Sequence, residues 1–89
     1  MRFTWDEAKR DANLRKHGLD FADAPEVFAG PTCTVEDSRL AYGEQRLMTL
    51  GLLRGLAVSI IHTETDYEIR IISFRNATKR EADFLLENL

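Results

Sequence analysis

LAVSIIH, residues 56–62, is the stretch that decides the fold, because it is an almost unbroken apolar run. Such a run is typical of a central strand that is covered on both faces. Gly55 marks a tight turn before it, and a polar turn at 63–66 follows it. The flanking segments 45–53 and 68–75 are β-prone, and links this short favour pairing between sequential neighbours. We therefore expect a series of hairpin-connected strands around residues 56–62.

Two further strands are expected upstream. Phe3 and Trp5 alternate with polar neighbours, which predicts a short strand over residues 2–5. Residues 32–36 are also β-prone, and the Gly30–Pro31 pair separates them from the segment before. These two strands would extend the sheet beyond the hairpin series.

Two helices are expected between these upstream strands. Asp6 is a favourable N-cap and Gly18 a favourable C′ residue, so they bound a first helix. Asp20 is positioned to cap a second helix over 21–29. Pro25 lies inside that pattern and leaves the boundary between turn and helix open.

A last helix is expected at the C-terminal end. Asn76 or Thr78 caps it, and Thr78 with Glu81 has the spacing of a capping box. Four apolar residues then fall at helical spacing, which predicts that this helix docks on the sheet through them. They are Ala82, Leu85, Leu86 and Leu89.

The resulting order of elements is β-α-α-β-β-β-β-α. It indicates an α+β fold with a small, mostly antiparallel sheet, two N-terminal helices and one C-terminal helix. The chain has 89 residues, so we expect a single domain over residues 1–89.

Composition limits the function classes. The net charge of −3 argues against a protein that coats nucleic acid non-specifically, although basic residues gather at 9–16 and 70–80. There is no apolar run of membrane-spanning length and no signal-peptide pattern, so we expect a cytoplasmic protein without membrane contact. Cys33 is the single cysteine, and it is expected to be a small buried strand residue rather than a catalytic thiol or a metal ligand.

The first helix carries a polar face. At about 100° per residue, four side chains fall within roughly a 100° arc: Lys9, Asn13, Lys16 and His17. Two interpretations stay open from spacing alone. The face is either a solvated helix surface with ion pairs such as Asp6–Arg10, or one wall of a binding groove.

The strand over 68–75 and the start of the last helix form a second candidate region. Period-2 alternation would place Ile69, Ile71, Ser73 and Arg75 on one face of this strand. Arg75 then precedes Lys79, Arg80 and Glu81 at a helix N-terminus, where anions are favoured. This cluster is either a phosphate cradle or a set of exposed charges in which Glu81 serves the capping box.

Sequence-local catalytic motifs are absent. There is no G-x-S-x-G, no phosphate-binding glycine loop and no H-E-x-x-H. The remaining enzymatic option is acid–base chemistry without metal or cofactor, built from Arg, Lys, His, Glu or Tyr. Ribonucleases suit that description, because the substrate's own 2′-hydroxyl is the nucleophile.

The two ends of the chain resemble the BrnT family of toxins. The opening motif is Trp5-Asp6, Lys9, Asn13, Lys16-His17-Gly18 and Asp20-Phe21-Ala22, and the closing motif is Ile71-Ile72-Ser73, Arg75, Ala77 and Lys79-Arg80-Glu81. Residues 32–62 match in pattern more than in residues. The resemblance covers the whole length and implies a bacterial type II toxin–antitoxin system with a cytoplasmic ribonuclease of RelE-like fold.

The resemblance also implies a partner and residue roles. The partner would be a BrnA-like antitoxin with a ribbon-helix-helix domain, and operator DNA would be contacted only through it. Carried over to this chain, the expected catalytic residues are His17, Arg75, Lys79 and Glu81. The expected RNA-binding residues are Lys9, Asn13, Lys16, Arg46, Arg70 and Arg80. The alternative is a non-catalytic, BrnT-like partner-binding module that acts as a co-repressor.

Overall fold

The computed structural model describes residues 1–37 and 43–89, and its elements follow the expected order. The strands are β1 (Arg2–Thr4), β2 (Cys33–Asp37), β3 (Arg46–Leu53), β4 (Leu56–Glu64) and β5 (Glu68–Asn76). The helices are α1 (Glu7–His17), α2 (Ala24–Phe28) and α3 (Lys79–Glu87). The expected second helix is divided into a 3₁₀ turn over Phe21–Asp23 and the short α2. The division falls where Pro25 occupies the first turn of α2.

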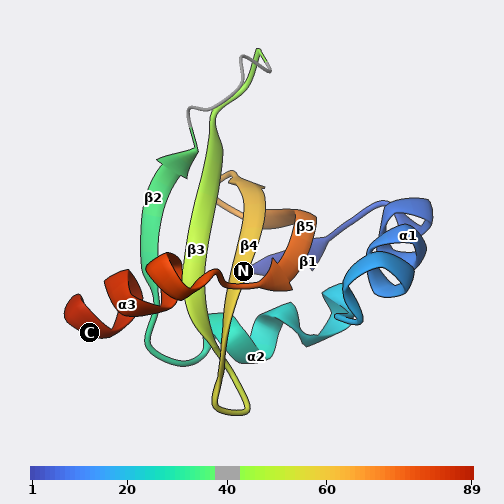
Figure 1. Cartoon of the computed structure of the whole chain (residues 1–89). Coiled ribbons are helices and arrows are strands. Elements are labelled where there is room, and N and C mark those ends of the chain that lie inside the picture. Colours follow the sequence, from blue (N-terminus) through green and yellow to red (C-terminus); the bar gives the residue numbers. More distant parts are fainter. Residues whose placement is uncertain (38–42) are drawn as a thin grey trace.

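The strands form one sheet in the order β1-β5-β4-β3-β2 (Figure 1). Neighbouring strands are antiparallel except for β1, which lies parallel to β5. The α+β class and the mostly antiparallel sheet are confirmed. The central strand is β4, and its residues Val58 to His62 are buried on both faces, as the apolar run predicts.

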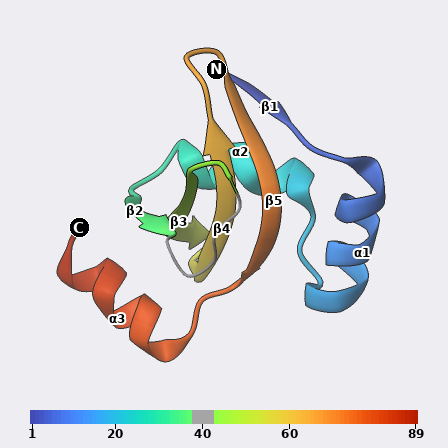
Figure 2. The same ribbon diagram turned by 90° about the horizontal axis from the view of Figure 1, so that it is seen from above.

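Helices cover the two faces of the sheet unequally. Figure 2 shows α2 on one side of the sheet, α3 on the other, and α1 beyond β5 at the edge. The main core lies between the sheet and the segment from the 3₁₀ turn through α2. Its buried members are Phe21, Ala24, Val27, Leu53, Val58, Ile60, Ile69, Ile71 and Phe74.

The face toward α3 is called the open face here, and strand register defines its members. Residues directly opposite in antiparallel strands place their side chains on the same face. Two rows cross the sheet on this side: Leu50–Ser59–Arg75, and Val35–Met48–Ile61–Ser73. Leu50 and Leu85 are fully buried where α3 lies over the sheet.

A bulge in β5 interrupts the in–out alternation of side chains that was expected for that strand. Ile61 is opposite Ser73 while His62 is opposite Ile71, so Ile72 is the extra residue. The bulge turns the remainder of the strand over. Ile69, Ile71 and Phe74 therefore share the core face, and the expected grouping of Ile69 and Ile71 with Ser73 and Arg75 is wrong.

The docking of α3 also differs from expectation. Leu85 is buried, but Leu86 and Leu89 are 66% and 56% exposed, so the prediction that they dock is wrong. Figure 1 shows the reason, because the C-terminal end of α3 extends past β2, where no sheet lies beneath it. Phe84 is also 42% exposed on this helix. An apolar surface is thus left on α3.

Gly51 sets the distance between α2 and β3. A Cβ atom at this position would lie 2.6 Å from Val27 Cγ1 and 3.2 Å from Thr32 Cγ2. Gly51→Ala is therefore expected to lower the free energy of unfolding by about 1–3 kcal/mol through overpacking. Urea denaturation measures the loss. Gly30→Ala is the matched control, because its Cβ would meet only Val27 O at 3.8 Å, and an equal loss in both variants would contradict the steric explanation.

Within residues 1–37 and 43–89, no helix combines the length and apolar character that crossing a membrane requires.

Candidate functional site

The side chain of Asn13, on the polar face of α1, attaches this helix to the sheet. Its Nδ2 donates to Phe74 O at 2.8 Å and to Leu19 O at 3.0 Å, and its Oδ1 accepts from Phe74 N at 3.1 Å. β1 pairs with β5 only at residues 68–70. Further along the edge of β5, the carboxamide of Asn13 serves the backbone of Phe74 as a neighbouring strand would.

Other residues of the opening motif also build the helix. The Asp6 side chain accepts from Lys9 N, and Gly18 ends α1 in the left-handed conformation, so both expected caps are confirmed. Arg10 makes a two-point ion pair with Asp20 at 2.7 and 3.0 Å and lies over the ring of Trp5. This guanidinium lowers the pKa of Asp20 to about 2. These contacts fix α1 against the segment that follows it.

The cations of the polar face line a shallow groove between α1 and β5. This depression of about 230 Å³ has Lys9, Lys16 and His17 on the helix side, with Ile72 and Ser73 on the strand side. Asn13 also lines it, but its amide is already occupied by backbone partners. The polar face of α1 thus lies beside β5, and three of its ionisable side chains surround the groove. Asn13 has a structural role here that accounts for its presence.

Arg75 and Glu81 form a two-point ion pair on the open face. Arg75 Nη1 and Nη2 donate to the two carboxylate oxygens of Glu81 at 2.8 and 3.0 Å. Glu81 Oε1 also accepts from Thr78 N, and Thr78 Oγ1 accepts from Glu81 N, which confirms the capping box. The Arg75 guanidinium holds the pKa of Glu81 below its ordinary value. The ion pair thus favours the charged form of Glu81.

Lys79 and Arg80 do not join this pair. Lys79 Nζ lies 3.0 Å from Asp83 at the exposed surface of α3. Arg80 lines a groove with Phe84 and the strand residues Val35 and Met48. The phosphate cradle of Arg75, Lys79 and Arg80 stays a prediction.

Arg46 and Arg70 lie on the open face by register. Arg46 is opposite Asp37 and two residues from Met48, while Arg70 is opposite Thr63, two residues beyond Ile61. Arg70 is exposed. The Arg46 guanidinium is mostly covered, with its Nε 3.6 Å from Glu44 Oε1. The open face thus carries arginines on β3 and at two points of β5.

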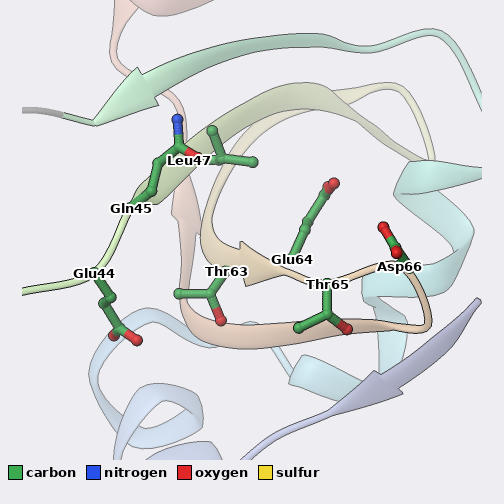
Figure 3. A pocket seen from close by; sticks show the side chains of 7 residues that line it. All are labelled: Glu44, Gln45, Leu47, Thr63, Glu64, Thr65 and Asp66. Carbon is green, nitrogen blue, oxygen red and sulfur yellow. The ribbon is translucent and has the colours of Figure 1, made fainter.

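A depression at one end of the sheet has the opposite charge. It measures about 470 Å³ and is lined by Glu44, Gln45, Leu47, Thr63, Glu64, Thr65 and Asp66. Figure 3 shows that the carboxylates of Glu64 and Asp66 point to the same side of the turn, while Glu44 points away from them. These carboxylates would repel phosphate, so this depression does not suit an RNA backbone. Among the described residues, no group of three or more His, Cys, Asp or Glu is arranged to hold a metal ion.

A polar chain on the core face, buried at Thr49 and His62 and exposed at Thr34, was not anticipated from the sequence. Thr34 Oγ1 and Thr49 Oγ1 lie 2.7 Å apart, and Thr49 Oγ1 lies 2.7 Å from His62 Nε2. The ring of Phe28 packs edge-on against His62. The one available signal was a histidine at the end of the apolar run 56–62.

The fold and this surface define a class: a small α+β protein that presents basic side chains at the edge and on one face of a mostly antiparallel sheet. A comparison of the sequence with known protein families identifies a family with these features. The ribonuclease toxin BrnT, of type II toxin–antitoxin systems, matches residues 5–81, and the chain belongs to this family. A search of curated proteins finds no match. An antitoxin partner follows from membership of a toxin–antitoxin family.

Proposed function

We propose that this toxin is a metal-independent endoribonuclease that cleaves RNA through the substrate's own 2′-hydroxyl. The observation that carries the proposal is the position of Arg75. Glu81 holds its guanidinium at two points on the open face, and the same strand borders the groove of Lys9, Lys16 and His17. Arg75 is suited to bind the scissile phosphate, because a guanidinium matches phosphate with parallel donors.

Proton transfer divides between two groups in this proposal. A base removes the proton of the 2′-hydroxyl, whose oxygen attacks phosphorus, and an acid gives a proton to the leaving 5′-oxygen. The products are a 2′,3′-cyclic phosphate and a free 5′-hydroxyl. Glu81 places a carboxylate beside the Arg75 guanidinium on the open face, so we assign it the role of the base and the orientation of Arg75. His17 then supplies the acid from the groove.

The remaining cations are proposed to bind the RNA backbone. Lys9 and Lys16 line the groove, while Arg46 and Arg70 extend the positive surface over the open face. Phosphate contacts of this kind position the strand and carry no base preference. Lys79 and Arg80, at the start of α3, are proposed to extend this surface, Lys79 from its ion pair with Asp83 and Arg80 from the groove beside Phe84.

Arg75→Ala tests the proposal. We expect this change to reduce RNA cleavage roughly 100-fold and to restore growth after induction, because the developing charge on the phosphate loses its main partner. Primer extension on total RNA and growth curves measure the two effects. Arg75→Lys should recover only part of the activity, since an ammonium lacks the two-point geometry.

The matched control is Arg15→Ala, which removes an exposed cation from α1 outside the groove. It should leave cleavage and toxicity unchanged. Circular dichroism of each variant separates loss of activity from loss of fold. Full toxicity of a folded Arg75→Ala protein would remove Arg75 from the mechanism.

A second candidate function is a non-catalytic module that acts as co-repressor with a ribbon-helix-helix antitoxin, which alone would contact operator DNA. One observation favours it: Arg75 and Glu81 already satisfy each other, and Glu81 also completes the capping box. Induced expression distinguishes the two. Growth arrest with new RNA ends, reversed by the protein of the neighbouring reading frame, supports the proposal of a ribonuclease that acts in the cytoplasm. Normal growth with soluble folded protein supports the proposal of a non-catalytic co-repressor module.

A further inference from the structure

An apolar groove runs between α3 and the edge of the sheet, away from the cationic groove beside α1. It measures about 270 Å³ and is lined by Val35, Met48, Leu50, Arg80, Glu81 and Phe84, with only apolar atoms at its surface. Phe84 forms the helix side and is 42% exposed. Exposed apolar area of this kind marks a site of association.

The neighbouring strand edge is open as well. β2 is the last strand in the sheet order, and among the described strands it pairs only with β3. Its other side therefore offers backbone donors and acceptors to a strand from another chain. Val35 alternates with exposed neighbours along β2 and faces the groove. A strand added beside β2 would place every second side chain toward the same groove.

Of the two charged residues that line the groove, Glu81 is paired with Arg75, so Arg80 limits the chemistry of the occupant. Arg80 lines the groove, and no ion pair to it is found in the described part of the chain. By contrast, Lys79, the residue before Arg80, is paired with Asp83 on the surface of α3. An occupant that buries the apolar wall near Arg80 without a counter-charge would lose affinity. A segment with alternating apolar residues and one acidic residue opposite Arg80 satisfies both requirements.

We propose that this surface, defined by β2, Phe84 and Arg80, is where the antitoxin docks by adding an extended segment to the sheet. The inference rests on the proposed function only in taking the partner to be the antitoxin of the toxin–antitoxin pair. The docked segment lies against α3, whose Glu81 lines the groove and orients Arg75. Inhibition would then act on the helix that holds the phosphate-binding arginine.

The test measures affinity between purified toxin and the protein of the neighbouring reading frame by calorimetry, with no RNA present. Phe84→Asp should raise Kd roughly 100-fold, because it places a charge in the centre of the apolar wall. Arg80→Glu should raise Kd roughly 10-fold and reduce its salt dependence. The controls are Leu14→Asp, at a residue that is also 42% exposed but lies on α1, and Arg15→Glu. Both controls should stay within about 2-fold of the wild type.

Two further readouts make the test decisive. Amide exchange at residues 33–37 should slow when the complex forms, which a contact through α3 alone would not produce. In cells, the Phe84→Asp toxin should stay toxic and escape neutralisation. Unchanged affinity of Phe84→Asp overturns the proposal, as does a β2 that gains no protection. A toxin dimer that Phe84→Asp dissociates while antitoxin binding persists would assign the groove to a second copy of this chain instead.

These outcomes are separable from the proposed function. If the wild-type protein cuts no RNA but binds its partner through this surface, the ribonuclease proposal fails and the interface stands. If it cuts RNA and Phe84→Asp binds normally, the reverse holds. If Arg80→Glu lowers cleavage without changing Kd, Arg80 belongs to the RNA surface and not to the antitoxin.

Discussion

Asn13→Ala is expected to lower the free energy of unfolding by about 4 kcal/mol, a large part of what holds a domain of this size together. The change removes one carboxamide but leaves three backbone groups without partners: the N–H and C=O of Phe74 and the C=O of Leu19. Phe74 is fully buried, and Asn13 itself is 7% exposed. Each buried polar group left unpaired costs about 1–3 kcal/mol.

Urea denaturation followed by the fluorescence of Trp5 measures this loss, because Trp5 packs against Phe21 in the core and is the single tryptophan. Asn13→Asp is the informative companion variant. Its carboxylate still accepts from Phe74 N but cannot donate to either carbonyl and repels both, so the loss should be at least as large at neutral pH. Asp11→Ala, on the exposed side of α1, is the control. A loss below about 1 kcal/mol for Asn13→Ala would mean that water replaces the amide.

The role of Asn13 shows where sequence reasoning ends. The helix around it was predictable, because Asp6 and Gly18 cap α1 through contacts with residues three or four positions away. Its partner Phe74 lies 61 positions along the chain. A periodic pattern places Asn13 on the same helix face as Lys9 and Lys16, but it does not distinguish a side chain that contacts the sheet from one that contacts a ligand.

The two errors in the sheet region have a similar physical origin. The apolar run 56–62 correctly predicts the central strand, because its residues are apolar on both faces. Alternation in β5 fails at Ile72, where one extra residue inverts the strand and no sequence signal marks it. Helical spacing in α3 identifies Leu85, but it carries no information on how much of the helix the sheet covers, and Leu86 and Leu89 stay exposed. Both outcomes depend on long-range geometry.

His62 is the residue through which acid should destabilise the fold. Its side chain is fully buried beneath Phe28, with Thr49 at Nε2. Burial lowers its pKa from 6.5 to about 4. The nearest acidic group, Glu64, is 3.6 Å from Nδ1, yet in this environment the neutral ring is still favoured.

The sign of the pH dependence follows from this lowered pKa. Between about pH 6.5 and pH 4, the unfolded chain binds a proton at His62 that the folded chain does not. The contribution of His62 to the free energy of unfolding is therefore fully present above about pH 6.5. It falls by up to about 3 kcal/mol as the pH decreases to about 4. Asp20 and Glu81 have lowered pKa values, so their contributions are lost only at lower pH, below ordinary values of 3.8 and 4.5. The interval from pH 6.5 to pH 4.5 thus reports on His62.

Urea midpoints across this interval, together with the NMR titration of the His62 ring, measure the effect. His62→Gln keeps a polar group near Thr49 but cannot titrate, so it should be less stable than the wild type at pH 7 and nearly independent of pH down to 4.5. The two proteins should therefore approach each other in stability as the pH falls. A wild-type protein of constant stability over this interval, or a His62→Gln variant that keeps the same slope, would show that another group carries the acid sensitivity. The predicted convergence would assign the acid sensitivity of the fold to His62, whose ring contacts Thr49 and, through Thr49, Thr34 on the edge strand β2.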